Sequence, residues 1–553
     1  MRKITRAFSL LLALTLIVTM LAGCQQNPTP DNAGQLDETD DAIKRGGTII
    51  TTASKEPVWY WFCGSSGGVE IVFSQLLSDH LVGFDENGEF IGRVAESWET
   101  SEDGLTWTFH IRKNVKWHDG EPLTARDCEF SYYYCYSEDL GTTNTGELNS
   151  DIVSKVEATD DYTLVITLTK PNNSLLSLLC GEVSNAFSLI PKHIWENIAP
   201  SEVTNQKLET YMVNCGPFKF AEYVTGEYIR LERNEEYYNG APYVDEWYIR
   251  MLSDTAANQN AFEAGELTML KSNAADYNNS MIAKGASYVQ AANGMNRQIK
   301  INYVAHPEFK DKTWAKAFKM LIDKETICDV IFPGTVPYDG PFTPVDTYFT
   351  EDVVSIPYDV DAAKQIIESY GYTMGADGYY QKDGQTLSYN ALVENSYQDL
   401  YLLLQDSWKK AGVKLELFIY DSDTYYSDDV FINLECHDWL IQQRDNMFGP
   451  DSLNYYTAYC RPDVPYHVAG AGYNNEEVNA LFEDALVNSD QSAVKEDLEK
   501  VQKLLAEDMA MYYIGYCQST LLYDSNLCMD EAGFRMWNQF NFAHPEKLYF
   551  KNN

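Results

Sequence analysis

Alternation of apolar and polar residues marks several short segments of this chain as half-buried β-strands. Residues 106–112 (TWTFHIR) place Trp107, Phe109 and Ile111 on one side, because successive side chains of a strand point to opposite faces. Alternation or a β-prone run predicts further strands at residues 48–53, 163–169, 229–233, 246–252 and 414–420.

Apolar residues at helical spacing predict helices, mostly in the second half. Trp314, Phe318 and Leu321 form an apolar stripe that ends at Asp323. Asp323 is expected to cap a new helix that carries Ile327 and Val330. The same spacing predicts helices at residues 69–77, 361–370 (ending at Gly371), 475–485 (capped by Asn475) and 494–509. Strands and helices are mixed throughout and no internal repeat is visible, which predicts an α/β or α+β chain of several lobes.

The N-terminus has the layout of an export signal. Basic residues precede an apolar run at residues 7–20, and Leu21-Ala22-Gly23-Cys24 follows. The run is shorter than the roughly 20 apolar residues of a permanent membrane span, so we expect residues 1–23 to be a signal peptide. The four-residue box resembles the lipobox of bacterial lipoproteins, in which the Cys becomes the diacylated N-terminus; this implies a lipid anchor on Cys24. An ordinary secretory peptide with a chance Cys is the alternative.

The composition of the chain after residue 23 indicates a tether and a folded body, and it excludes some classes of binding partner. Residues 24–44 are polar and without apolar period, as in a flexible tether. The body after them has enough length for several domains, and 45% of the chain is hydrophobic, which excludes disorder of the body. Lys and Arg total 41 against 82 acidic residues, a formal charge of −41. Such a surface repels phosphates, so neither nucleic acid nor anionic headgroups are expected partners.

Cysteine spacing argues against a structural zinc site. Ten of the eleven Cys lie after residue 24, scattered and without a CxxC pair. In an exported protein they could form long-range disulfides or stay reduced, and both readings are open.

Several segments together resemble one protein family. Residues 94–98 (VAESW), 102–112 (EDGLTWTFHIR) and 115–125 (VKWHDGEPLTA) are similar to the signature of family 5 solute-binding proteins, the peptide- and nickel-type receptors of ABC importers. The likeness continues, in the family's order, at residues 215–218 (CGPF), 231–238 (LERNEEYY), 261–266 (AFEAGE), 317–325 (AFKMLIDKE) and 358–364 (YDVDAAK).

The resemblance implies a periplasmic-binding-protein-like α/β fold of three lobes. Lobe I would comprise residues 45–75, 215–293 and 513–553; lobe II would be an insertion at 76–214; lobe III would span 294–512. Lobes I and III would close by a hinge around a small organic solute. We therefore expect a lipid-anchored, monomeric extracytoplasmic receptor that delivers its ligand, most often an oligopeptide, to a membrane permease driven by separate ATPase subunits. It has no Gly-Lys-Ser/Thr phosphate loop, and we expect no cofactor, no metal and no catalysis.

One segment of lobe III carries the ligand prediction. In the peptide-binding branch a Trp-x-x-Asp motif supplies a carboxylate for the ligand's α-ammonium. In residues 438–446 of this chain Trp439 matches, but Gln442 occupies the Asp position, and an amide lacks the charge for a strong ammonium contact. Asp445 could substitute if the loop is shifted, with Arg444 holding a carboxylate as a planar fork. Alternatively, Arg444 and Asp445 are solvated loop charges.

An aromatic loop after the first strand is the second candidate. Trp59, Tyr60 and Trp61 lie where family members contact ligand, and four consecutive aromatics with Phe62 cannot all point into a core. Ordinary packing within the lobe is the alternative. The chain has 39 Tyr, which suits sugar or aromatic ligands as well as peptides, so an oligosaccharide receptor stays open.

Two readings from other classes have weaker support. Residues 64–68 match G-x-S-x-G, but the predicted strand ends near Ala53, too early for the nucleophile elbow of a serine hydrolase. Cys436, His437 and Asp438 are metal-ligand types, yet adjacent residues of a strand face opposite ways, so His437 is expected to be packed or on the surface. A nickel-complex receptor remains possible through the family alone.

Overall fold

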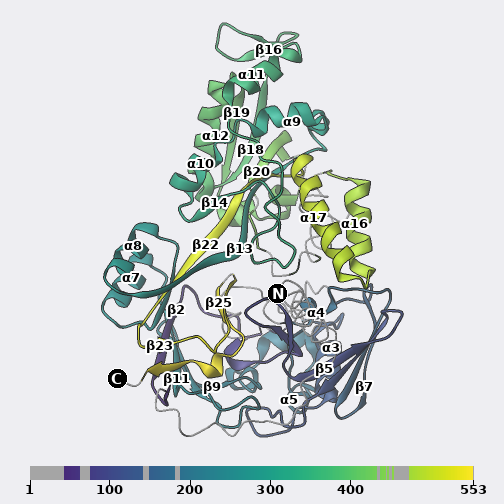
Figure 1. Cartoon of the computed structure of the whole chain (residues 1–553), viewed down its shortest axis with the longest axis vertical. Coiled ribbons are helices and arrows are strands. Elements are labelled where there is room, and N and C mark those ends of the chain that lie inside the picture. The colour runs from purple at the N-terminus through teal and green to yellow at the C-terminus, as the bar shows by residue number, and fades with distance from the viewer. Residues whose placement is uncertain are drawn as a thin grey trace, which may run out of the picture. The chain divides into compact units, whose positions relative to one another are not determined.

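The first predicted strand joins a sheet whose other members follow much later in the chain. The computed structural model describes residues 43–60, 62, 75–140, 148–180, 187–432, 436–443, 445–447, 451, 453, 472–537 and 539–551. In it β2 (Thr48–Ala53) pairs in parallel with β11 (Glu246–Met251). The antiparallel strands β10 (Tyr228–Arg233) and β9 (Phe218–Val224) complete the order β2-β11-β10-β9 (Figure 1). These strands confirm the predictions at residues 48–53, 229–233 and 246–252.

A second, antiparallel sheet forms within predicted lobe II. Its order is β5 (Ala95–Thr100), β6 (Thr106–Ile111), β8 (Thr163–Leu168) and β7 (Val153–Asp160). Trp107, Phe109 and Ile111 all face the core, as the alternation predicts. The other elements of this stretch of the chain are β3 (Val82–Phe84), β4 (Phe90–Gly92), α3 (Ala125–Cys135), α4 (Leu175–Leu178), α5 (Lys192–Trp195), a 3₁₀ turn (Pro200–Asn205) and α6 (Leu208–Tyr211).

The largest sheet contains two long strands that the pattern did not predict. β13 (Ser287–Ile301) and β22 (Tyr512–Tyr523) run antiparallel along one another (Figure 1). The order is β12 (Met269–Ser272), β22, β13, β20 (Trp439–Gln443), β18 (Ser388–Glu394) and β19 (Lys414–Tyr420), with β14 (Thr335–Pro337) on β22 and β21 (Asn446–Met447) on β13. Of these only β19 was predicted.

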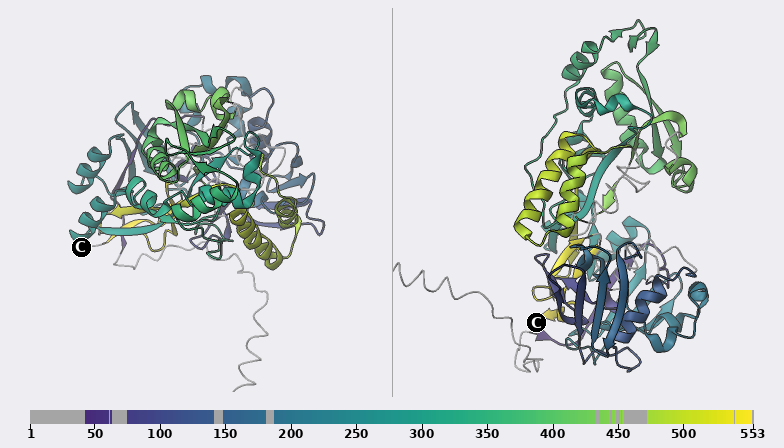
Figure 2. Two further views of the ribbon diagram at one scale, coloured as in Figure 1. Left: turned by 90° about the horizontal axis from the view of Figure 1, so that it is seen from above. Right: turned by 90° about the vertical axis from the view of Figure 1, so that its right-hand side faces the viewer.

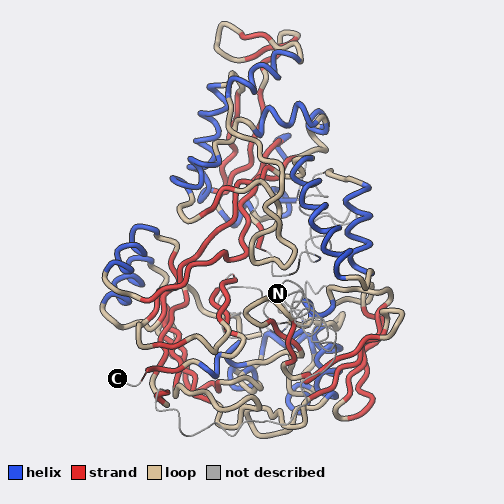
Figure 3. The backbone as a smooth tube through the Cα atoms, in the orientation of Figure 1, coloured by secondary structure: helices blue, strands red, loops and turns tan. Residues whose placement is uncertain are grey.

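Helices cover this sheet and confirm most of the helical pattern (Figure 3). Asn475 caps α16 (Glu476–Val487), which pairs with α17 (Gln491–Glu507), the two yellow-green helices of Figure 2. The other helices are α7 (Thr255–Glu263), α8 (Ala275–Ala283), α9 (Lys312–Lys319), α10 (Lys324–Thr326), α11 (Val360–Ser369), α12 (Gln398–Lys410) and α13 (Ser422–Tyr425).

One helix prediction needs a correction. Asp323 does cap α10, accepting a bond from the Thr326 amide, but α10 passes at once into a π turn (Ile327–Ile331). This wider turn keeps Ile327 in the core while the Val330 side chain is 67% exposed, so Val330 is not part of the apolar stripe. In the predicted helix at 69–77, residues 69–74 lie outside the described residues.

Small elements complete the fold. They are β1 (Ile43–Lys44), β15 (Thr373–Met374), β16 (Tyr380–Lys382), β17 (Gln385–Thr386), β23 (Leu527–Cys528), β24 (Phe534–Trp537), β25 (Gln539–Phe542), β26 (Tyr549–Lys551), the 3₁₀ turns Pro307–Lys310, Asn395–Tyr397, Cys436–Asp438 and Pro545–Lys547, and the π turn Asp428–Ile432. Within the described residues no helix is long and apolar enough to cross a bilayer.

The buried apolar residues form separate clusters rather than one core. One gathers around β6 and β8, another around β2 and β11, and a third lies between α9, α12 and β18. Trp195 and Tyr211, assigned to lobe II from the sequence, pack in the same cluster as Trp247 of β11. The division into three lobes at the stated boundaries stays a prediction.

The segment after β8 is tied closely to the β2–β11 cluster. The amide of Gly216 donates to the Leu77 carbonyl at 2.7 Å, and a Cβ at Gly216 would lie 2.5 Å from Leu77 backbone carbon. Only glycine permits this approach. Cys128, Cys215, Cys328, Cys436, Cys517 and Cys528 are free thiols; Cys63 and Cys460 lie outside the described residues.

Candidate functional site

A row of buried polar side chains follows one face of β13. Asn296, Gln298 and Lys300 alternate along the strand with Ile299 and Ile301, which enter the core of α9 and α12. Gln298 is 0% exposed and Lys300 is 4% exposed. The polar side chains of a half-buried strand are normally exposed to water, so a row of buried polar side chains needs an explanation.

Strand β20 adds an amide and an aromatic ring to this row. Gln442 lies opposite Lys300 in the antiparallel register and is 0% exposed. The Lys300 ammonium lies 5.6 Å from the centre of the Trp439 ring. Trp439 is fully buried in a small cluster with Leu392, Tyr425 and Val430. Asn296, Gln298, Lys300 and Gln442 are called the polar face below.

The amides of the polar face are unsatisfied. Both Nε2 and Oε1 of Gln298, and both of Gln442, lack a hydrogen-bond partner among the described residues. Asn296 is half satisfied, because its Nδ2 donates to the carbonyls of Gly340 at 2.9 Å and Pro341 at 3.0 Å while its Oδ1 has no partner there. Each buried polar group left unpaired costs about 1–3 kcal/mol. Such a set is rare unless something else completes it.

Asp445 faces the other side of β13. The registers Ile299↔Gln443 and Asn296↔Asn446 set Asp445 opposite Arg297, and alternation turns this pair away from Gln298. The Arg297 guanidinium pairs with the Asp445 carboxylate, which also accepts a 3.1 Å bond from the Tyr397 hydroxyl. The guanidinium carbon lies 4.0 Å from the centre of the Phe332 ring.

The Arg297–Asp445 pair is internal. Burial raises the pKa of the Asp445 carboxyl above its ordinary value, and the adjacent Arg297 opposes that rise. The alternative of a solvated loop charge is therefore wrong for Asp445. Its charge is already compensated by the protein, so an ammonium ligand would have to compete with Arg297 for it.

The structure brings some predicted site residues together and separates others. Trp439, Gln442 and Asp445 lie on β20 and just beyond its end. Trp59 instead meets Tyr223 edge-on at 4.9 Å, and Trp59 and Tyr60 pack against the core of β2 and β11. Trp61, Arg444 and Cys24 lie outside the described residues, as do residues 1–42 and 64–68.

Sequence reasoning missed Asn296, Gln298 and Lys300. The only local signal was the alternation in residues 296–301 (NRQIKI). Alternation of this kind is typical of a strand whose polar side faces solvent, so it does not mark these residues as buried.

The argument against a metal site at residues 436–438 assumed a strand, and that element is wrong. They form a 3₁₀ turn rather than a strand, and His437 has a φ of 55°. The His437 ring stacks on Phe418 with ring centres 4.1 Å apart. Across the described part of the chain no group of three or more metal-ligand side chains occurs.

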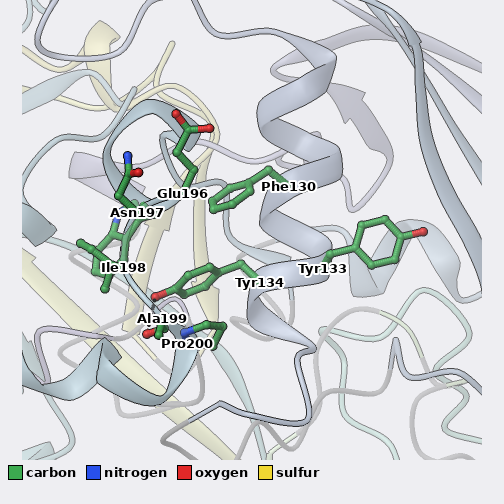
Figure 4. A pocket seen from close by; sticks show the side chains of 9 residues that line it. Phe130, Tyr133, Tyr134, Glu196, Asn197, Ile198, Ala199 and Pro200 are labelled. Carbon is green, nitrogen blue, oxygen red and sulfur yellow. Dashed lines mark hydrogen bonds between the residues drawn. The ribbon is translucent and has the colours of Figure 1, made fainter.

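A pocket of about 400 Å³ lies elsewhere, between α3 and residues 196–200 (Figure 4). Tyr134 packs on Trp195 with ring centres 5.7 Å apart, and the Glu196 carboxylate accepts a 2.6 Å bond from the Lys192 ammonium. In Figure 4 the Tyr133 ring extends away from the other side chains. These groups are engaged within the protein, so the polar face is the better candidate site.

Comparison with known proteins gives one matching family model. Residues 89–477 match the model described as "Bacterial extracellular solute-binding proteins, family 5 Middle". This match includes the whole polar face and the sheet around β6.

Two relatives of similar sequence are named for different ligands. The oligopeptide-binding protein AppA of Bacillus subtilis is 24% identical over 548 residues, covering 95% of this chain and 96% of that protein. Heme-binding protein A of Haemophilus influenzae is 25% identical over 440 residues, covering 75% and 77%.

Solved structures share the fold. The ABC transporter substrate-binding protein CtaP of Listeria monocytogenes matches with a TM-score of 0.76 at 25% identity, covering 92% of this chain and 100% of that one. Bacillus subtilis AppA in complex with a nonapeptide matches with a TM-score of 0.73 at 24% identity, with the same coverage. The predicted α/β, periplasmic-binding-protein-like fold class is thereby confirmed.

Proposed function

The chain belongs to family 5 of the bacterial extracellular solute-binding proteins, and on that premise we propose that it captures an oligopeptide and delivers it to an ABC permease. The receptor itself catalyses no reaction. It acts outside the cytoplasm as a monomer, held to the membrane by a diacylated Cys24 after removal of residues 1–23. A separate ATPase drives the permease.

The observation that carries the proposal is the pair of unsatisfied side-chain amides, Gln298 and Gln442, on the polar face. A peptide main chain presents N–H donors and C=O acceptors in turn, and the amides of Gln298 and Gln442 each offer one acceptor and a two-proton donor. Binding a peptide would supply the missing partners of buried groups, which is worth more than the same bonds at a wet surface.

Other predicted residues receive roles in the same proposal. Trp439 supplies the apolar wall beside Gln442, and Trp59, Tyr60 and Trp61 line the opposite side of the ligand. Arg444 holds a ligand carboxylate. Asp445 serves the α-ammonium only if the Arg297 pair opens, so a charged N-terminus is a weak requirement of this site.

An oligosaccharide is the second candidate ligand. Neutral amides beside a tryptophan ring also suit sugar hydroxyls and the apolar face of a pyranose, and Gln442 stands where the peptide-binding branch has a carboxylate. The peptide is preferred because the amides of Asn296 and Gln298 succeed one another along β13, matching the repeat of a main chain.

Thermal unfolding in the presence of candidate ligands tests the proposal. The chain from residue 25 onward is titrated with a degenerate nonapeptide library, with oligosaccharides and with nickel chelates. A ligand at 100 times its Kd stabilises the folded state by about 2.7 kcal/mol, which shifts the midpoint measurably. Stabilisation by peptides is expected. Stabilisation by sugars or nickel chelates alone would overturn the peptide assignment.

A further inference from the structure

A contact that includes no residue of the polar face joins predicted lobes II and III. The backbone amide of Asn173 donates to the Leu486 carbonyl at 2.7 Å. The Asn173 side chain donates to the carbonyls of Ala485 at 2.8 Å and Asn488 at 2.7 Å. Asn173 directly precedes the short helix α4 and its turn, whereas the three carbonyls belong to the end of α16.

Asn173 acts as the C-terminal cap of a helix more than three hundred residues away. The last carbonyls of a helix have no partner within it. The last turn of α16 has no basic residue, and its C-cap, Asn488, is extended with φ −78° and ψ 128°. A left-handed glycine cap is thus replaced by donors from another part of the chain. The neighbouring Asn172 side chain fixes the donor segment by accepting bonds from Ser174 N at 2.9 Å and Ser174 Oγ at 2.7 Å.

The same segment makes a further bond to predicted lobe III, at a residue outside α16. The Ser177 hydroxyl of α4 donates to the Asp451 carboxylate, and both residues are buried. The other Asp451 oxygen accepts the Leu453 amide at 2.9 Å. The bonds of Asn173 and Ser177 to Ala485, Leu486, Asn488 and Asp451 are called the α4–α16 contact.

Predicted lobe II is bound firmly to lobe I. Asp79 accepts bonds from the hydroxyls of Tyr237 and Tyr238, both at 2.7 Å, and from Arg93 Nε at 2.9 Å. With all of these groups largely buried, breaking the network is costly. Separating predicted lobe II from predicted lobe I would break these buried bonds.

The predicted boundaries between lobes I and III fall within β13 and at the start of β22. Their pairing is interrupted between Ala292 and Asn296, and again between Arg297 and Gln298. Gly294, inside the first interruption, has a φ of 78°, which a residue with a side chain rarely adopts. Such breaks in a long ribbon bend and twist it locally.

We propose that the α4–α16 contact is a latch that holds lobe II against lobe III in the closed receptor, so that residues which touch no ligand slow ligand release. This inference rests on the proposed function for the meaning of closure. The latch itself exists independently of which solute is bound.

Hydrogen exchange followed by mass spectrometry of the full-length protein tests the latch. In Asn173→Ala, exchange of the backbone amide at position 173 should become about tenfold faster, because two bonds of the contact are lost. Ser177→Ala should also accelerate it, since the contact opens as a unit. The matched control is Asn475→Ala, which removes the cap at the other end of α16 and should leave exchange at position 173 unchanged. Unchanged exchange at 173 in Ser177→Ala would overturn the latch and leave Asn173 a local cap.

A ligand arm separates this inference from the proposed function. With a degenerate nonapeptide library, protection of residues 294–302 and 439–443 should increase, and position 173 should be protected further. Protection at the polar face without any at position 173 would contradict the latch. No protection at the polar face would contradict peptide binding, while the ligand-free comparison of variants still decides the latch.

Discussion

Three glutamines of predicted lobe III are fully buried, and they differ in what surrounds their amides. Gln502 of α17 donates from Nε2 to the carbonyls of Tyr348 at 2.7 Å and Leu498 at 3.2 Å. Its Oε1 accepts the Thr350 amide at 3.2 Å. Gln298 and Gln442 of the polar face have no such bonds to any described residue.

The difference shows that burial of a polar residue does not by itself indicate a site. The amide of Gln502 ties the segment at 348–350 to α17, and its bonds offset the loss of water. Gln298 and Gln442 also lose their contact with water, but without gaining bonds to any described residue, and such buried unpaired groups are tolerated mainly where function requires them. Among the three fully buried glutamines, the two with unsatisfied amides mark the candidate site.

The largest expected effect comes from removing the ring beside the polar face. Trp439→Ala should lower the free energy of unfolding by about 3–5 kcal/mol, because a fully buried ring leaves a cavity. It should also weaken binding of the nonapeptide library at least about tenfold, measured by titration calorimetry. Trp408→Ala removes an equally buried ring from the α12 core and should cost similar stability with the Kd unchanged. Equal affinity in both variants would remove Trp439 from the site.

A smaller effect is expected at the satisfied glutamine. Gln502→Leu leaves the Tyr348 carbonyl and the Thr350 amide without partners, so the free energy of unfolding should fall by about 1–3 kcal/mol in denaturant titrations. Ligand affinity should not change. A loss of affinity in Gln502→Leu as large as that expected for substitutions of Gln298 and Gln442 would contradict the distinction between Gln502 and the polar face.

The stability effect at Asn296 should lie between that at the satisfied Gln502 and that at the unsatisfied Gln298 and Gln442. Asn296→Leu loses the bonds of Nδ2 to two carbonyls but relieves the unpaired Oδ1, so the expected loss of stability is about 1 kcal/mol. Thermal unfolding of this variant alongside Gln502→Leu gives the comparison. A stability gain in Asn296→Leu would mean that the bonds to Gly340 and Pro341 contribute nothing.

The elements found from the sequence are those whose pattern is local. β6 alternates cleanly because only one face meets the core, and α16 has an asparagine cap and helical spacing. β22 (YYIGYCQSTLLY) is buried on both faces, so it lacks alternation and was missed. In β13 the alternation exists, but its polar side is buried and not solvated.

Only part of the candidate site could be predicted from the sequence. Trp439, Gln442 and Asp445 came from the family resemblance, whereas Gln298 and Lys300 lie far away in sequence. The register that sets Lys300 opposite Gln442 depends on strand pairing, which no local pattern encodes. For the same reason the Arg297 partner of Asp445 was invisible.

The most direct test of the account is the double variant Gln298→Leu/Gln442→Leu, measured by denaturant unfolding and by calorimetry with the nonapeptide library. Replacing unpaired buried amides with apolar groups of similar shape should leave the free energy of unfolding unchanged or raise it, while ligand affinity falls at least about tenfold. A loss of stability like that of Gln502→Leu, with affinity preserved, would contradict the assignment of the polar face as the ligand site.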